Sequence, residues 1–371
     1  MRTPQTANAA GLLDPVSMGA LRLPNRVIMS PLTRCRASEG RVPNTLMAEY
    51  YRQRASAGLI LSEATAVTQM GVGYPNTPGI WSEEQAEGWQ RVTDAVHKEG
   101  GRMCLQLWHV GRISDPIYLH GKLPVAPSAL APEGQVNLLR PRKNYVVPRA
   151  LELNEIPEIV EDFRIGAKNA KHAGFDGVEI HGANGYLINE FLSPASNHRT
   201  DCYGGPVENR ARLLFEVMDA VTWVWGAERV GLHISPGDNS YSVANDQSRA
   251  TYEYVVREVS LRKIAFLCVR ESTKACIRHG PALRKLFEGV FIVWLRSRTR
   301  SILKKLKIHC HGVLISSIAC ILASSGCSSV EDVQAARTET TNFVTDTESQ
   351  KPANPRVHPG QPYTQEIWLD L

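Results

Sequence analysis

The run His181-Gly-Ala-Asn-Gly-Tyr186 carries an imidazole, an amide and a phenol close together in the chain. Its two glycines predict a tight turn, on which His181 and Asn184 direct hydrogen-bond donors at one oxygen atom. Such donors stabilise negative charge that develops on a carbonyl or nitro group, and Tyr186 adds a proton donor beside them. The alternative is a core histidine with a packing aromatic. The apolar segment Phe175–Ile180 before the run favours the catalytic interpretation.

Other polar groups also follow apolar segments. They are Pro31-Leu-Thr-Arg34, Glu63-Ala-Thr65, Gln106-Leu-Trp-His109, and His233 with Ser235. In a parallel α/β barrel the carboxyl ends of the strands meet at one rim, where catalytic residues lie. The sequence therefore predicts one site at that rim, assembled from segments that are distant in the chain.

Seven short apolar segments are candidate strands. They are rich in Val, Ile and Leu and lack polar alternation, which is typical of parallel strands buried on both faces. Their ranges are Arg26–Leu32, Leu59–Val67, Cys104–Gly111, Gly177–His181, Val230–Pro236, Ala265–Arg270 and Gly289–Val293.

Helical segments separate several of these strands. One is predicted over Glu155–Ala173, with Asn154 as its N-cap and apolar residues at the helical period. A second is predicted over Val207–Trp225. The alternation predicts an α/β fold, a TIM (β/α)₈ barrel, for which 371 residues are ample. Only seven strands precede residue 294, so we expect a barrel that is incomplete or irregular at strand eight.

Composition sets wider limits on function. The net charge of +5 is too evenly balanced to indicate nucleic-acid binding. None of the eight cysteines forms a C-x-x-C pair, which favours free thiols in a reducing compartment. Met1–Leu13 contains no apolar run of the kind found in a secretory signal. We therefore expect a cytoplasmic protein with no stable membrane association.

Several motifs together resemble the Old Yellow Enzyme family, which includes bacterial enone and nitro-ester reductases and plant oxophytodienoate reductases. They are Asn25–Arg34, Arg54–Gly58, Leu105–Arg112, Pro148–Leu151, Gly174–Tyr186, Arg199–Gly205 and Glu208–Arg210. The resemblance extends over about residues 12–293. It implies an FMN-dependent enzyme that takes hydride from NADPH or NADH and reduces activated C=C bonds or nitro compounds. No G-x-G-x-x-G fingerprint is evident at a strand–helix junction, so a classical dehydrogenase is disfavoured.

The resemblance also implies a cofactor site. The Thr33 hydroxyl would donate to the flavin carbonyl beside N5, and Gln106 would bind the pyrimidine edge. Pro31, Leu32 and Ala64 would contribute backbone contacts to the ring. Family members often carry Arg on the fifth strand, facing the N1–C2 edge of the flavin, whereas this chain has His233. A histidine provides that positive charge only when it is protonated.

The same resemblance implies the residues of the substrate site. His181 and Asn184 would bind the substrate oxygen, and Tyr186 would protonate the substrate. Trp108 would shape the cavity over the flavin, although ordinary packing is the alternative for this residue. Tyr74 and Arg149 are further candidates for the cavity walls. The partners are small molecules; the sequence does not predict an oligomeric state.

The resemblance ends after Val293. Trp294-Leu-Arg296 replaces the family's phosphate-contacting Asn, and no strand-eight motif follows. We therefore assign residues 1–293 to a flavin-binding barrel and 294–371 to an atypical tail. This tail has a basic and apolar segment at 296–326 and a segment at 328–371 that we expect to be disordered.

Three interpretations of this tail remain open. They are an altered or fused reading frame, a makeshift eighth strand within Gly312–Leu322, and a lipoprotein-like anchor at Cys327. The alternative for function is a truncated or frameshifted, non-catalytic barrel that no longer holds FMN. No metal site is expected, because His309-Cys-His311 has no further ligands at suitable spacing.

Overall fold

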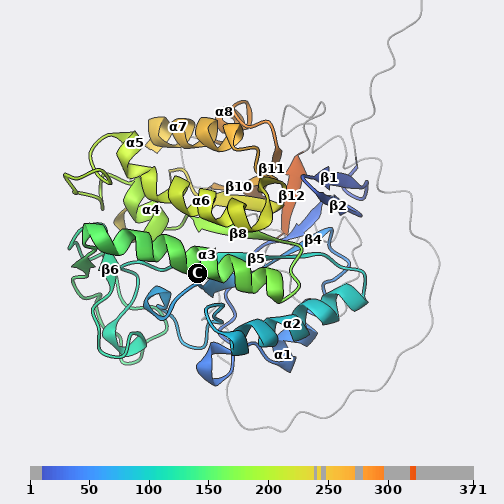
Figure 1. Ribbon diagram of the computed structural model, residues 1–371, viewed down its shortest axis with the longest axis horizontal. Helices are drawn as coiled ribbons and strands as arrows, with labels where there is room; N and C mark the ends of the chain where they lie inside the picture. Colours follow the sequence, from blue (N-terminus) through green and yellow to red (C-terminus); the bar gives the residue numbers. More distant parts are fainter. Residues whose placement is uncertain (1–10, 238–239, 244–247, 272–278, 296–317, 323–371) are drawn as a thin grey trace, which may run out of the picture.

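The chain forms a closed barrel of eight strands in the order β10-β11-β12-β3-β4-β5-β8-β9 (Figure 1). The structure is a computed structural model and describes residues 11–237, 240–243, 248–271, 279–295 and 318–322. The barrel strands are β3 (Val27–Met29), β4 (Leu59–Ala66), β5 (Met103–Trp108), β8 (Gly177–Gly182), β9 (Val230–Ile234), β10 (Phe266–Glu271), β11 (Val290–Leu295) and β12 (Ile318–Leu322).

Seven of these strands pair in parallel, which confirms the predicted α/β barrel. Each corresponds to a predicted segment, with ends that differ by a few residues. β3 ends at Met29 instead of Leu32, and β5 ends at Trp108 instead of Gly111. Pro31 has no backbone N–H to donate to a neighbouring strand, which accounts for the early end of β3.

The eighth strand is antiparallel to both neighbours, so the barrel closes irregularly, as expected. β12 pairs with β11 in the register Ile292↔Ile321 and with β3 in the register Ala319↔Ile28. It lies within Gly312–Leu322, which was one of the three interpretations of the tail. The rest of that segment and the proposed anchor at Cys327 lie outside the described residues.

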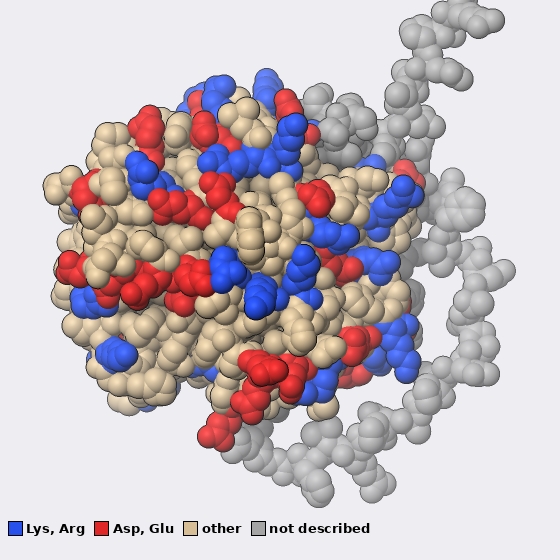
Figure 2. Space-filling view, in the orientation of Figure 1, with Lys and Arg blue, Asp and Glu red and all other residues tan. Residues whose placement is uncertain are grey.

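Helices cover the outside of the strands (Figure 1). They are α1 (Thr45–Arg52), α2 (Glu83–Lys98), α3 (Ile156–His172), α4 (Leu187–Leu192), α5 (Val207–Arg210), α6 (Arg212–Trp225), α7 (Ser248–Leu261) and α8 (Gly280–Arg284). Phe163 of α3 and Val217 of α6 are fully buried in one core cluster with Ile180 of β8. Basic and acidic side chains intermingle on the visible outer face (Figure 2).

Two details of the helix predictions were wrong. Asn154 lies in a 3₁₀ turn over Leu153–Glu155, and Glu155 occupies the N-cap position of α3. The helix predicted over Val207–Trp225 is two helices, α5 and α6, which separate at Ala211. The adjoining Arg210 is buried and donates to the carbonyl oxygen of Leu192, a tertiary contact that no sequence period reveals.

A hairpin of β1 (Val16–Met18) and β2 (Leu21–Leu23) covers the amino-terminal end of the barrel. Met18 is fully buried against Ile28 and Phe266, which lie near the starts of their strands. Gly19 between the two strands has φ +55°, and a Cβ there would lie 2.1 Å from the Glu228 carbonyl oxygen. This end is therefore closed by packing, which leaves the opposite end for chemistry.

We predict that β12 is necessary for stability. Cys320 pairs with Val293 on one side and Val27 on the other. Cys320→Pro removes an N–H from this ladder and is expected to lower the free energy of unfolding by roughly 3 kcal/mol. Cys320→Ser keeps the N–H and serves as the control. Urea unfolding of the full chain measures both, and equal stability of the two variants would show that β12 does not close the barrel.

Candidate active site

The loop after β8 carries the three residues singled out by the sequence. Asn184 has φ +59° and Gly185 has φ +79°, so the chain makes the tight turn that the glycines predicted. The Asn184 N–H donates to Ser235 Oγ at 2.7 Å, next to the end of β9. A Cβ at Gly185 would lie 2.7 Å from the Ser240 carbonyl oxygen, so only glycine fits there.

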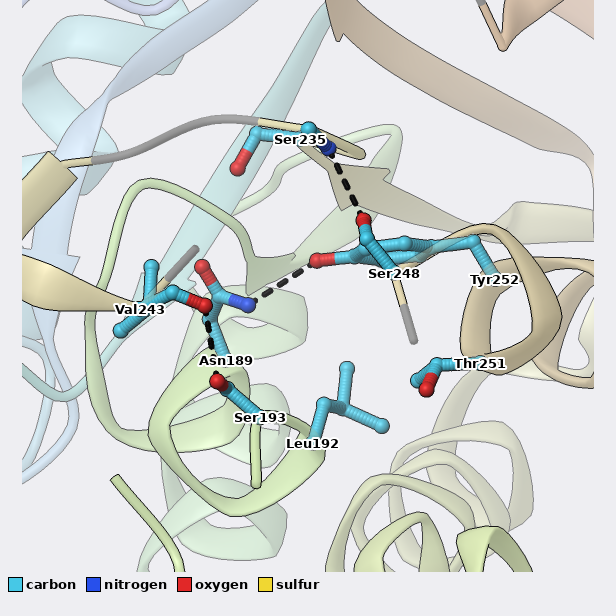
Figure 3. Close-up of a pocket in the computed structure, with 9 residues that line it drawn as sticks. Asn189, Leu192, Ser193, Ser235, Val243, Ser248, Thr251 and Tyr252 are labelled. Carbon is cyan, nitrogen blue, oxygen red and sulfur yellow. Dashed lines mark hydrogen bonds between the residues drawn. The ribbon is translucent and has the colours of Figure 1, made fainter. Parts of the chain in front are cut away.

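Asn189 of α4 holds this turn from behind. Its Oδ1 accepts from the Gly185 N–H at 2.8 Å, and its Nδ2 donates to the Tyr252 hydroxyl of α7 at 2.9 Å. Figure 3 shows Asn189, Ser193 and Tyr252 around a small cavity, with Ser193 donating to the Val243 carbonyl oxygen. These buried bonds fix the loop that presents Asn184 and Tyr186.

Aromatic rings gather around Trp108 at this end of the barrel. Its ring centroid lies 5.4 Å from Tyr74, 5.0 Å from Tyr186 and 6.3 Å from His181. The structure thus brings the predicted wall residues Trp108 and Tyr74 beside the predicted catalytic residues.

A phenol network joins this aromatic cluster. The Tyr186 hydroxyl lies 2.7 Å from that of Tyr74, which lies 3.2 Å from that of Tyr241. Asn137 Nδ2 donates to both Tyr74 and Tyr241. Burial holds the pKa of the Tyr186 phenol well above its usual value, so the group keeps its proton. Asn137 and Tyr241 were not predicted, because they lie outside the strands and no local pattern distinguishes them.

A buried polar group lies deeper in the barrel. Gln106 Nε2 donates to Glu179 Oε2 at 2.6 Å and lies 3.3 Å from His233 Nδ1. Burial raises the pKa of Glu179 to about 8 and lowers the pKa of His233 well below its usual value. His233 is therefore neutral at physiological pH and does not provide the positive charge that a protonated histidine would.

The remaining predicted cofactor residues lie at the same end. Pro31, Leu32 and Thr33 follow β3, and the Arg34 N–H donates to Glu63 Oε2 at 3.1 Å, which ties this segment to β4. Ala64 is buried in β4 and pairs with Gln106 of β5. Arg149 lies apart: it is exposed in β7 (Arg149–Ala150) and forms an ion pair with Glu155 at 2.6 Å. The structure does not bring Arg149 into the site.

Arg270 joins the site, although it was not among the predicted site residues. It lies in β10, and its Nη1 donates to Asn184 Oδ1 at 2.5 Å. Its place at the carboxyl end of the predicted strand Ala265–Arg270 could have identified it as a site residue, as the same position did for His181.

The polar groups at this rim fit the edge of a flavin ring. Ser30 Oγ, Trp108 Nε1 and Glu179 Oε1 are buried and lack a hydrogen-bond partner among the described residues. Buried polar atoms of this kind are rare unless a ligand or water satisfies them. Together with the Thr33 hydroxyl and the Gln106 amide, they match the carbonyl oxygens and ring nitrogens of isoalloxazine. The phosphate-contacting Asn expected after β11 is absent from the sequence, and residues 296–317 lie outside the described residues.

A parallel barrel with this donor set at its carboxyl rim defines a flavin-dependent oxidoreductase. Residues 11–271 match the family model of the NADH:flavin oxidoreductase / NADH oxidase family. The chain belongs to this family. It is accordingly an FMN-dependent enzyme with a nicotinamide hydride donor.

Known relatives are similar over most of the chain. Rice (Oryza sativa subsp. japonica) 12-oxophytodienoate reductase 1 is 41% identical over 296 residues, 77% of this chain and 77% of the relative. A Leishmania infantum protein named probable flavin mononucleotide-dependent alkene reductase is 44% identical over 287 residues, 75% of this chain and 79% of the relative.

Solved structures share the fold. The Old Yellow Enzyme homologue of Zymomonas mobilis has a TM-score of 0.76 and 41% identity, and the match covers 81% of this chain and 86% of that chain. Morphinone reductase in complex with tetrahydroNAD has a TM-score of 0.75 and 44% identity, and the match covers 82% of this chain and 85% of that chain.

Two absences hold for the described part of the chain. No group of three or more His, Cys, Asp and Glu side chains there is arranged to hold a metal ion. None of its helices combines the length and apolar character needed to cross a membrane.

We predict that Glu179 makes stability depend on pH. The folded chain holds the Glu179 proton up to about pH 8, whereas the unfolded chain releases it near 4.5. The folded state therefore binds more protons in this window, and the free energy of unfolding falls as pH rises through it. Glu179→Gln is expected to reduce that fall by on the order of 2 kcal/mol.

Urea unfolding of the flavin-free chain at pH 5 and pH 8 measures this effect. The exposed Glu87→Gln serves as the control, and its pH profile should match that of the unchanged chain. If the free energy of unfolding fell equally from pH 5 to pH 8 in Glu179→Gln and in the unchanged chain, Glu179 would not be the source of the pH dependence.

Proposed function

We propose that this chain reduces activated C=C bonds, with His181 and Asn184 holding the substrate oxygen and Tyr186 donating the proton. One observation carries the proposal: the His181 and Tyr186 rings lie 5.1 Å apart, and Asn184 lies on the tight turn between them. The names of the relatives, an oxophytodienoate reductase, an alkene reductase and morphinone reductase, support α,β-unsaturated carbonyl compounds as the substrate class.

The hydrogen bonds around His181 make it a donor toward substrate. Burial lowers its pKa to about 3, so the ring is neutral and carries one proton. Its Nδ1 accepts from the Ala183 N–H at 3.3 Å, which places the ring proton on Nε2. Asn184 is oriented in the same way, because Arg270 occupies its Oδ1 and leaves the NH₂ group to donate. Two donors thus stabilise negative charge on the substrate oxygen.

FMN, when bound, supplies the hydride that it has received from NADH or NADPH. Tyr186 delivers the proton to the α-carbon, which is the carbon of the double bond next to the carbonyl group. The neighbouring Tyr74 hydroxyl at 2.7 Å can return a proton to Tyr186 through the phenol network. Thr33, Gln106 and His233 would hold the polar edge of the ring, with Pro31, Leu32 and Ala64 as backbone contacts.

Nitro compounds are the second substrate class, because the same two donors suit a nitro oxygen. We also propose a cytoplasmic location. Cys35, Cys104, Cys202 and Cys268 have free thiols, which supports a reducing compartment. The second candidate function is a non-catalytic barrel without FMN, which would be an exception within this FMN-dependent family; it is motivated by the missing phosphate motifs in the sequence after Val293.

We predict that Tyr186→Phe separates the two half-reactions. Without the phenolic proton, alkene reduction is expected to slow by about 100-fold or more, whereas reduction of bound flavin by NADPH stays within a few-fold. Stopped-flow absorbance measures each step alone. Tyr145→Phe removes a phenol that is hydrogen-bonded to Asn137 and not to Tyr186, so it should affect both half-reactions little. Equal losses in both half-reactions of Tyr186→Phe would refute its role as the proton donor.

FMN binding by the full chain decides between the two functions. We expect the purified protein to show flavin absorbance bands and its apo form to bind FMN tightly at one equivalent. Loss of the phosphate contacts, each worth roughly 1.5–3 kcal/mol, would weaken binding by orders of magnitude. A colourless protein that binds no added FMN would favour the non-catalytic barrel.

A further inference from the structure

Arg270 occupies the interior face of the barrel at its catalytic end. Phe266 and Cys268 precede it at alternate positions of β10, and both are buried in the interior cluster with Ile28 and Ile292. Side chains alternate along a strand, so Arg270 shares this face. Cys268 pairs with His233 of β9, which places Arg270 two residues nearer the rim than that histidine.

The guanidinium has a defined contact there. Arg270 Nη1 donates to Asn184 Oδ1 at 2.5 Å, a charge-assisted hydrogen bond. A cation in this position does two things. It orients the Asn184 amide. It also places a fixed positive charge directly beside that amide, which is one of the two donors for the substrate oxygen.

Four described groups at this end of the barrel, His181, His233, Glu179 and Tyr186, are neutral at physiological pH. Burial lowers the pKa values of His181 and His233, and the nearby guanidinium of Arg270 acts in the same direction. Burial raises the pKa of Glu179 to about 8, so this carboxyl keeps its proton. The Tyr186 phenol is also protonated. Among these described groups and Arg270, the one that carries a charge is Arg270.

We propose that Arg270 is the cation of this active site and stabilises the negative charge that reduction places on the bound flavin and on the substrate oxygen. The inference rests on the proposed function. Neutral His233 of β9 cannot stabilise negative charge on the reduced flavin, whereas Arg270 of β10 can. Arg270 is thereby added to the residues that act on the reacting groups.

Flavin affinity in two redox states tests this proposal without measuring turnover. The apo form of the full chain is titrated with oxidised FMN in air and with reduced FMN under anaerobic conditions. Arg270→Met is expected to lower the preference for reduced over oxidised FMN by about tenfold or more, because a unit charge near the anion is lost. Arg270→Lys keeps the charge and should retain most of the preference. Arg36→Met, an exposed arginine after β3, is the control.

The ratio of the affinities for reduced and oxidised FMN distinguishes an effect of charge from an effect on structure. Equal weakening of both redox states in Arg270→Met, or an unchanged ratio, would overturn the proposal. Should Arg270→Met fail to fold, Arg270→Gln replaces it with the same expected change of ratio. Failure of the unchanged chain to bind FMN in either state would instead overturn the proposed function, and this inference with it.

Discussion

Burial at the carboxyl end of the barrel sets the protonation state of four groups at the site. Burial keeps Glu179 and Tyr186 protonated and leaves His181 and His233 neutral. Neutral histidine is a directional donor whose tautomer its neighbours select, and a protonated phenol is a proton source. A guanidinium keeps its charge in such surroundings, which is why Arg270, beside these groups, is important to the electrostatics of the site.

Closure of the barrel is the geometric requirement behind that desolvation. Seven parallel strands leave β3 and β11 with open edges, and an open edge admits water between them. β12 fills this position in an antiparallel direction. Its backbone can do so because antiparallel pairing satisfies the same donors and acceptors as parallel pairing. The barrel therefore keeps its form although the sequence after Val293 departs from the family.

The loop after β8 shows how distant elements cooperate on one residue. Asn184 receives a hydrogen bond from Arg270 of β10 and donates its N–H to Ser235 beyond β9. Gly185 is held by Asn189, which is held in turn by Tyr252 of α7. Each contact restricts the turn from a different direction, so the two donors for the substrate oxygen are oriented before any ligand binds.

The sequence by itself determined the seven parallel barrel strands and the groups at their carboxyl ends. Val- and Ile-rich segments predict buried parallel strands, and His181, Asn184 and Tyr186 follow one of them directly. Only the tertiary structure decided the break between α5 and α6, the surface position of Arg149 and the contact of Arg270 with Asn184. It also decided that His233 is neutral. A local pattern encodes periodicity and turns, whereas burial and long-range hydrogen bonds depend on which segments the closed barrel brings together.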